Sequence, residues 1–240
     1  MKTRLYKSKE RGHADYGWLK ANYSFSFANY HNSEREHFGA LRVLNDDFIN
    51  GGAGFGEHPH KNMEIISIPL KGGLKHKDSM SNTWIPLHAG EVQVMSAGSG
   101  IQHSERNESS KELLNLFQIW IIPDTMNVQP DYGQKVFDRN ERNGKLQTLV
   151  HSYKDDLTDE LRIHQDAQIS RIDLSKEKSF DYTLRSSNHG VYVMLISGEI
   201  KVADSMLNSR DAIGIWHTDS FKIEAEDNAE ILFIEVPMVF

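Results

Sequence analysis

Two short pairs of polar residues, His58 with His60 and His103 with Glu105, are the part of the sequence best suited to bind a metal ion. Each pair is spaced i, i+2, and residues at this spacing in a strand point to the same face. Both members of a pair can therefore reach one cavity. Three imidazoles and one carboxylate suit a single transition-metal ion and leave positions open for a substrate or dioxygen. The spacing thus predicts one metal site.

Histidine is frequent in this chain, with twelve in 240 residues, so either pair alone is a weak signal. Roughly 0.6 His-x-His pairs are expected by chance at that frequency. The His-x-acid spacing also recurs elsewhere, beginning at His13, His76, His164 and His217. The prediction therefore depends on the two pairs occurring together, each close to turn glycines.

The composition restricts both the metal site and the class of partner. The chain has no cysteine, which excludes disulfides and thiolate ligands, so a metal must be held by nitrogen and oxygen. The net charge of -7 and the pI near 5.9, without a basic stripe, argue against direct binding of nucleic acid. No run of about 18 apolar residues is present, and no apolar stretch follows the basic residues at the N-terminus. We therefore expect a cytoplasmic protein that does not enter a membrane.

The residues around the two pairs have the pattern of short strands. Gly72 and Gly73 predict a hairpin turn, and residues 97–100 predict a second turn just before His103. One short helix is expected within residues 155–162, and no long amphipathic helix is indicated. At this length the chain can form one large all-β domain or two of ordinary size. Strand-like patterns cover residues 41–45, 63–70, 91–95 and 116–122.

The second half of the chain repeats the strand and turn pattern of the first. Residues 191–200 have the strand, glycine turn and strand of residues 65–74, which indicates a duplicated barrel. The positions that correspond to the three histidines carry other side chains: Leu184, Ser186 and Ile223. Since residues 123–144 are rich in turn formers, we divide the chain into a metal-binding domain, 1–132, and a domain without ligands, 133–240.

These motifs resemble those of a known family. The first cupin motif is matched by Gly52, His58-Pro59-His60, Glu64 and Gly72, and the second by Gly90, Gly98, His103 and Asn107. Four residues rather than two separate Gly98 from His103, and Ser96 stands where cupins often have proline. With these departures, the stretch Gly-Ser-Gly-Ile-Gln-His-Ser-Glu at residues 98–105 and the residues 11–18 and 24–30 make the chain similar to the pirin family. It looks closest to the bacterial pirin-like proteins known as quercetin 2,3-dioxygenases.

The resemblance implies an all-β fold of two tandem cupin barrels, of the double-stranded β-helix or jelly-roll type, with the metal in the N-terminal barrel. It assigns His58, His60, His103 and Glu105 as the ligands of one divalent transition metal. Fe(II) is preferred by resemblance alone, because three nitrogens and a carboxylate also suit Mn, Ni, Cu or Zn.

The resemblance also implies an activity, that of a metal-dependent dioxygenase. Such an enzyme opens the heterocyclic ring of a flavonol such as quercetin with O2 and releases carbon monoxide. The expected substrate is therefore a small aromatic or flavonol-like molecule. We expect Glu105 to be catalytic and to take the proton of the flavonol 3-hydroxyl, because a carboxylate at the metal is well placed to act as a base.

Other residues near the two pairs have supporting roles in this interpretation. Glu64 lies at an even offset from His58 and His60, so we expect it to hydrogen-bond a ligand imidazole. Phe55 and Met63 are candidates for the wall of the pocket. Other histidines are not expected to be metal ligands. His13 is expected to form a structural hydrogen bond, and we expect exposed positions for His31, His37, His76 and His88.

A second class of function remains open, a metal-binding sensor or regulatory module without turnover. Because the acidic charge disfavours DNA, such a module requires a protein partner. A third class is a metal cupin with other chemistry, such as an isomerase. Oxygen uptake with flavonols separates the dioxygenase from the module.

Overall fold

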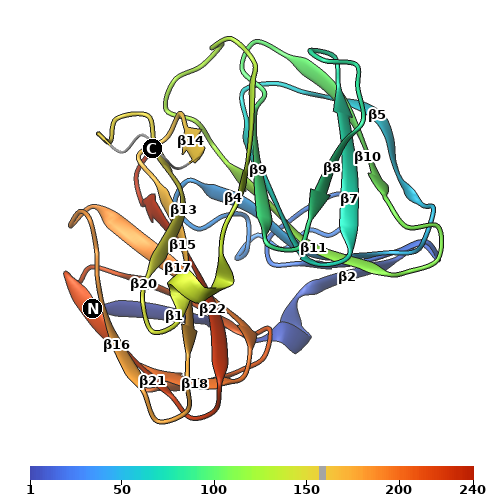
Figure 1. Ribbon diagram of the computed structural model, residues 1–240. Coiled ribbons are helices and arrows are strands. Elements are labelled where there is room, and N and C mark those ends of the chain that lie inside the picture. The colour runs from blue at the N-terminus through green and yellow to red at the C-terminus, as the bar shows by residue number, and fades with distance from the viewer. Residues whose placement is uncertain (157–160) are drawn as a thin grey trace.

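The computed structural model describes residues 1–156 and 161–240, and Figure 1 shows them as two β-barrels side by side. In these residues the chain forms 22 strands and two short 3-10 helices, η1 (Ser8–Glu10) and η2 (Arg139–Arg142). The predicted all-β class and the pair of barrels are thus confirmed. No helix in this described part of the chain is long and apolar enough to cross a bilayer.

The N-terminal barrel consists of a seven-stranded and a four-stranded sheet. Its strands are β2 (Gly12–Asp15), β3 (Leu19–Tyr23), β4 (Leu41–Ile49), β5 (Gly54–His60), β6 (Glu64–Lys71), β7 (Gly73–Asp78), β8 (Ile85–His88), β9 (Glu91–Ser96), β10 (Ile101–Asn107), β11 (Leu114–Ile121) and β12 (Asp131–Val136). The larger sheet has the order β12-β9-β6-β11-β4-β3-β2, and the smaller has the order β5-β10-β7-β8.

The C-terminal barrel also consists of one seven-stranded and one four-stranded sheet. Its strands are β1 (Lys2–Tyr6), β13 (Gln147–Ser152), β14 (Leu161–Ile163), β15 (Gln168–Leu174), β16 (Ser179–Thr183), β17 (His189–Ser197), β18 (Glu199–Val202), β19 (Ser205–Asn208), β20 (Ala212–Trp216), β21 (Ser220–Ala225) and β22 (Ala229–Pro237). The larger sheet has the order β1-β20-β17-β22-β15-β13-β14, and the smaller has the order β16-β21-β18-β19.

The two large sheets are buried on both faces, because each covers its own barrel and also packs against the other barrel. In β6, Ile66 and Ile68 belong to a core shared with the C-terminal barrel, whereas Ile65 faces the inside of its own barrel. A strand between two cores is apolar on both faces, which explains why β6 has Ile65 on one face and Ile66 and Ile68 on the other. The shared core also contains Phe117, Ile119, Tyr192, Met194, Leu232 and Ile234.

The sheet pairing divides the chain differently from the predicted division in two places. Strand β1 pairs with β20 in the C-terminal barrel although it precedes the whole N-terminal barrel. Strand β12 pairs with β9 as far as Val136, so the predicted boundary after residue 132 falls inside a strand. The turn formers in residues 123–144 therefore flank a strand rather than form one continuous linker.

The helix predicted within residues 155–162 is absent from the described part of that segment. Asp155 and Asp156 lie in bends, and Leu161 and Arg162 belong to β14, which pairs in parallel with β13. Residues 157–160 lie outside the described residues.

Candidate metal centre

The two predicted pairs lie on neighbouring antiparallel strands of the smaller sheet, β5 and β10. His103 is directly opposite His58 in their register, and His60 is two residues further along β5. The register shifts between His103 and Glu105, and such a bulge re-aims the side chain that follows it. All four residues line one cavity of the N-terminal barrel. The i, i+2 spacing agrees with this shared cavity, and within 4.8 Å His58, His60 and His103 form one group, whereas Glu105 forms a second group with His76 and His103.

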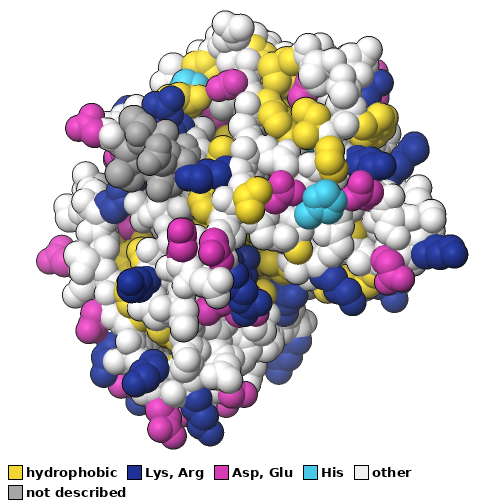
Figure 2. Space-filling view, viewed as in Figure 1, with side chains coloured by type: hydrophobic (Ala, Val, Ile, Leu, Met, Phe, Trp, Pro, Cys, Tyr) yellow, Lys and Arg dark blue, Asp and Glu magenta, His cyan; other side chains and the backbone are white. Residues whose placement is uncertain are grey.

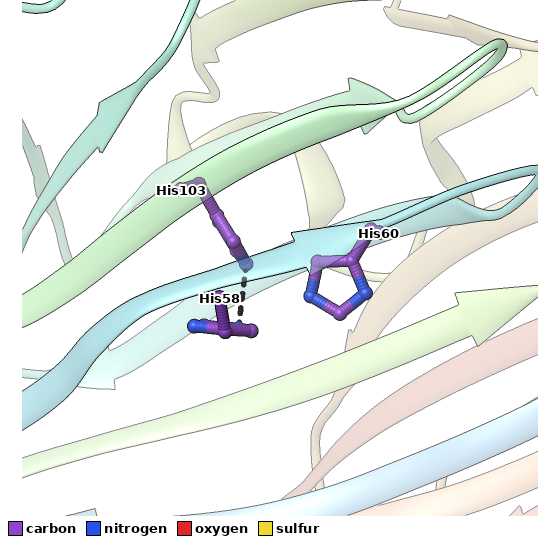
Figure 3. A group of neighbouring side chains, drawn as sticks. All are labelled: His58, His60 and His103. Atoms are coloured by element: carbon purple, nitrogen blue, oxygen red, sulfur yellow. Dashed lines mark hydrogen bonds between the residues drawn. The ribbon is translucent and has the colours of Figure 1, made fainter.

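The three imidazoles lie close enough to share one ion. Figure 3 shows His103 pointing from β10 toward His58, with His60 beside them on β5. The Nε2 atoms of His58 and His103 are 2.9 Å apart. The centre of the His60 ring lies 4.9 Å from that of His58 and 4.8 Å from that of His103. One nitrogen from each ring lies within 4.8 Å of the others.

The surroundings of His60 and His103 keep these two imidazoles neutral, the form in which they bind metals. Burial, together with the neighbouring His103 and His58, lowers the pKa of His60 to about 4. Burial and the neighbouring His58 and His76 lower the pKa of His103 to about 3. At neutral pH both rings are therefore unprotonated at one nitrogen, and that nitrogen has a free lone pair.

The hydrogen bonds of the rings direct their lone pairs into the cavity. His58 Nδ1 lies 2.8 Å from the Gly56 carbonyl oxygen, so Nδ1–H donates and Nε2 is left as the acceptor. His60 Nε2 is buried and has no hydrogen-bond partner among the described residues. A buried nitrogen without a partner is costly, and a metal ion at the centre would satisfy it. The donor set, three nitrogens and a nearby carboxylate, therefore fits a divalent transition metal.

Glu105 is buried with 3% of its surface exposed, and an amide holds its carboxylate in place. Gln118 Nε2 donates to both carboxylate oxygens, at 2.9 and 2.8 Å, and Ser67 Oγ donates to one of them at 3.4 Å. A Cβ at Gly54 would collide with the Glu105 carbonyl oxygen. A glycine is therefore needed at this point for β5 to approach β10.

His76 was expected on the surface, and that prediction was wrong, since it is fully buried. Its Nε2 lies 3.0 Å from Asp78, and its Nδ1 lies 3.5 Å from Nδ1 of His103. If Nε2–H donates to Asp78, Nδ1 accepts from His103 and leaves the His103 Nε2 lone pair for a metal. His76 and Asp78 have the same i, i+2 spacing as the two predicted pairs, and this could have indicated an inward-facing His76. The packing of Tyr132 from β12 against His76 was not expected from the sequence.

Among the described residues, six aromatic side chains line the cavity. The cavity has a volume of about 570 Å³ and contains Phe55, one of the two wall residues expected from the sequence. The ring of Trp18 packs edge-on against Phe55 at 5.3 Å, and Trp120 packs edge-on against His60 at 4.9 Å. Such walls suit a planar aromatic ligand. The other aromatic lining residues are Tyr16, Tyr23 and Phe27.

Two polar residues of β4, Asn45 and Asp47, also line the cavity. Only the alternation of polar and apolar residues in this strand pointed to them. Their Oδ1 atoms are buried and have no hydrogen-bond partner among the described residues. Burial, helped by the nearby Asp46 and Glu105, raises the pKa of Asp47 well above its usual value. Asn45 and Asp47 are thus able to hydrogen-bond a polar group of a ligand.

Glu64 and Met63 lie outside this cavity, so the roles expected for them need correction. Glu64 accepts a hydrogen bond of 2.5 Å from Ser96, and burial raises its pKa to about 7. Its neighbour Ile65 faces the cavity, which leaves Glu64 on the opposite face of β6. Met63 packs against the small cluster around Ile65. Counting along the chain failed because the segment between β5 and β6 is not a strand and contains Asn62 with a positive φ of 50°.

The other histidines agree with what was expected of them. His13 Nδ1 lies 3.3 Å from the side-chain oxygen of Asn22, which fits a structural hydrogen bond. His31, His37 and His88 are exposed, as predicted.

A pair of barrels, one with three inward-facing histidines and a buried carboxylate, defines a two-barrel cupin protein with a candidate metal centre. Comparison with known families agrees. Residues 4–121 match the family model Pirin, and residues 149–236 match the model described as the quercetinase C-terminal cupin domain. Together with the relatives below, this shows that the chain belongs to the pirin family, as the sequence motifs predicted.

Three similar proteins match this chain over nearly their whole length. The chain is 40% identical over 235 residues to the quercetin 2,3-dioxygenase of Escherichia coli (strain K12), covering 98% of this chain and 99% of the relative. It is 40% identical to a pirin-like protein of Caulobacter vibrioides, covering 93% and 95%. Among solved structures, the bacterial pirin YhhW from Escherichia coli, in complex with nickel(II), superposes with a TM-score of 0.92 at 37% identity and covers 99% of this chain and 100% of that one.

Proposed function

We propose that the protein is a metal-dependent dioxygenase that opens the heterocyclic ring of flavonols such as quercetin. The observation that carries the proposal is the buried His60 Nε2, which has no partner among the described residues and lies beside the imidazoles of His58 and His103 in a cavity with aromatic walls. The relatives named quercetin 2,3-dioxygenase support the same reaction.

The proposed ligands are His58, His60 and His103, with Glu105 as the fourth. Iron(II) is our proposed metal in the cell, and the nickel(II) in the related bacterial pirin indicates that other divalent ions fit such a donor set. When bound, the metal would act as a Lewis acid toward the substrate hydroxyl and would help dioxygen to react with the substrate.

The residues of this chain have three tasks in the reaction. Phe55 and Trp120 hold the flat flavonol rings and keep water from them. Glu105 takes the proton of the 3-hydroxyl and later returns it to the carboxylate of the product. Gln118 keeps the Glu105 carboxylate in position through its two hydrogen bonds. One dioxygen is consumed, both of its oxygen atoms enter the ring-opened ester, and one ring carbon leaves as carbon monoxide.

The test is turnover by the metal-loaded protein. Quercetin is supplied with iron, manganese, nickel, copper or zinc, while oxygen uptake, carbon monoxide and the ring-opened depside are measured. His60→Ala should abolish all three, whereas the control His88→Ala removes an exposed imidazole and should change nothing. If no metal gives a ring-opened product, the dioxygenase proposal fails, and a sensor or regulatory module with a protein partner becomes the better account.

A further inference from the structure

A second cavity, of about 500 Å³, lies between the two barrels. The N-terminal barrel contributes the end of β6 and the turn before β9, and the C-terminal barrel contributes η2, β15, β17 and β22. Figure 2 shows dark blue and magenta side chains gathered in the recess between the two lobes. We call this cavity the interbarrel cleft. It is separate from the histidine cavity, with which it shares no lining residue.

The interbarrel cleft is basic, although the chain as a whole has a net charge of -7. Among its described lining residues one is acidic, Glu230. Five are cationic: Lys71, Arg139, Arg142, Arg171 and Arg210. A local excess of guanidinium groups on an acidic protein concentrates anions at that place.

The ion pairs around the cleft leave part of this charge uncompensated. Glu230 pairs with Arg139 and Arg171 at 2.8 and 2.9 Å. Two carboxylates from outside the lining also contribute. Asp173 pairs with Arg139 and Arg142 at 2.9 and 3.0 Å.

The second of these carboxylates, Asp46, pairs with Arg210 at 3.4 Å. Asp46 is shared with Arg11, a further cation, at 3.6 Å. Five cations of the lining thus face three carboxylates, so at least two positive charges remain.

One of the guanidinium groups is both buried and incompletely bonded. Arg171 is 6% exposed, and its Nε has no hydrogen-bond partner within residues 1–156 and 161–240. Burial and the neighbouring Arg142 lower its pKa to about 10. A buried cation with an unfilled donor is unfavourable unless an acceptor is supplied. The cleft is therefore short of negative charge and of hydrogen-bond acceptors.

We propose that the interbarrel cleft binds a small oxyanion with two or more negative charges, carried by phosphate or by carboxylate groups. Guanidinium groups bind both kinds of oxyanion through paired hydrogen bonds. The volume exceeds that of one phosphate, and Leu70 and Ile196 give the cleft an apolar portion. The ligand is thus a small phosphorylated or polycarboxylate metabolite. Because it would contact both barrels, its binding should also raise the stability of the folded protein.

The experiment is a calorimetric titration of the metal-loaded protein with pyrophosphate, with citrate and with sodium chloride at matched ionic strength. Pyrophosphate or citrate should bind at one site and raise Tm, whereas chloride should not. Pyrophosphate binding alone identifies the phosphate class, and citrate binding alone identifies the carboxylate class. If neither binds at millimolar concentration, the proposal is overturned.

Two variants locate the site. Lys71→Gln and Arg210→Gln should each weaken binding at least about tenfold, about 1.4 kcal/mol. The control Lys222→Gln removes the same charge from the far sheet, on β21, and should bind as the wild type does. Thermal unfolding without anion checks that each variant folds. Lys71 is exposed, so Lys71→Gln still tests the proposal if Arg210→Gln does not fold. Unchanged affinity in both variants, or an equal loss in Lys222→Gln, contradicts the proposal.

Anions also bind to metal ions, so the titration is repeated with metal-depleted protein. Binding in the interbarrel cleft should persist after the metal is removed. Binding that disappears with the metal would place the anion at the histidines instead and overturn the assignment.

Discussion

Replacing Gln118 by leucine should weaken metal binding without unfolding the barrel. Gln118 is buried, and its Nε2 is the donor to both oxygens of Glu105. A hydrogen bond to a charged group contributes about 1.5–3 kcal/mol, and one nitrogen supplies both contacts, so we take about 2 kcal/mol for the pair. If this energy is lost from the metal-bound state, the dissociation constant rises about 30-fold. That value lies within the 10–100-fold range typical of groups that orient metal ligands.

The measurement is competition for the metal against a chromophoric chelator, at neutral pH, for wild type and Gln118→Leu. The matched control is Gln168→Leu in the C-terminal barrel, where the amide donates to Ser170 and is remote from the histidines. The control should bind metal as the wild type does. An affinity of Gln118→Leu within about twofold of wild type, less than about 0.4 kcal/mol, would show that Gln118 does not support a ligand carboxylate.

Three further outcomes are expected. Metal binding should be lost as the pH falls through about 4, because His60, whose pKa is lowered to about 4, is then protonated, and His103 is protonated near pH 3. The metal-free protein should lose stability as the pH falls from 6.5 to 4, because over this range these histidines take up protons only in the unfolded state. A free energy of unfolding in denaturant that does not change over this range would contradict the prediction. Gly54→Ala should cost about 1–3 kcal/mol of stability, because the new Cβ meets the Glu105 backbone; an unchanged denaturation midpoint would refute it. Phe55→Ala should weaken quercetin binding about tenfold, from the loss of about 1.4 kcal/mol of ring contact, measured by fluorescence quenching of the cavity tryptophans, with metal affinity unchanged.

The strand pattern of the sequence predicted a duplicated barrel and put the members of each pair on one face, whereas the cupin type of the barrels and the set of ligands were implied by the family resemblance. Alternation of side chains holds within a strand, and β5 and β10 are strands over both pairs. The same rule failed for Glu64, because the turn at Asn62 separates it from β5 and resets which face it occupies. Local spacing has no information across such a turn.

Features that depend on contacts distant in sequence were not predictable in this way. His76 is buried against the ring of Tyr132 on β12, and no residue close to His76 in the sequence indicates this contact. The aromatic and polar lining of the cavity likewise comes from β3, β4, β5 and β11 and from the segments on either side of β3. The cleft between the barrels depends on how two separately predicted halves pack.

Strand β1 has a consequence for how the molecule is made. Its only described strand partner is β20, and about two hundred residues separate them in the chain, a separation that slows folding. During synthesis, residues 2–6 can pair with β20 only after nearly the whole polypeptide has been made. A chain that ends at the boundary between the barrels would leave these residues unpaired. The N-terminal half expressed alone would therefore have β1 without its partner strand. The C-terminal half expressed alone would have an unpaired edge at β20, and unpaired strand edges promote association between chains.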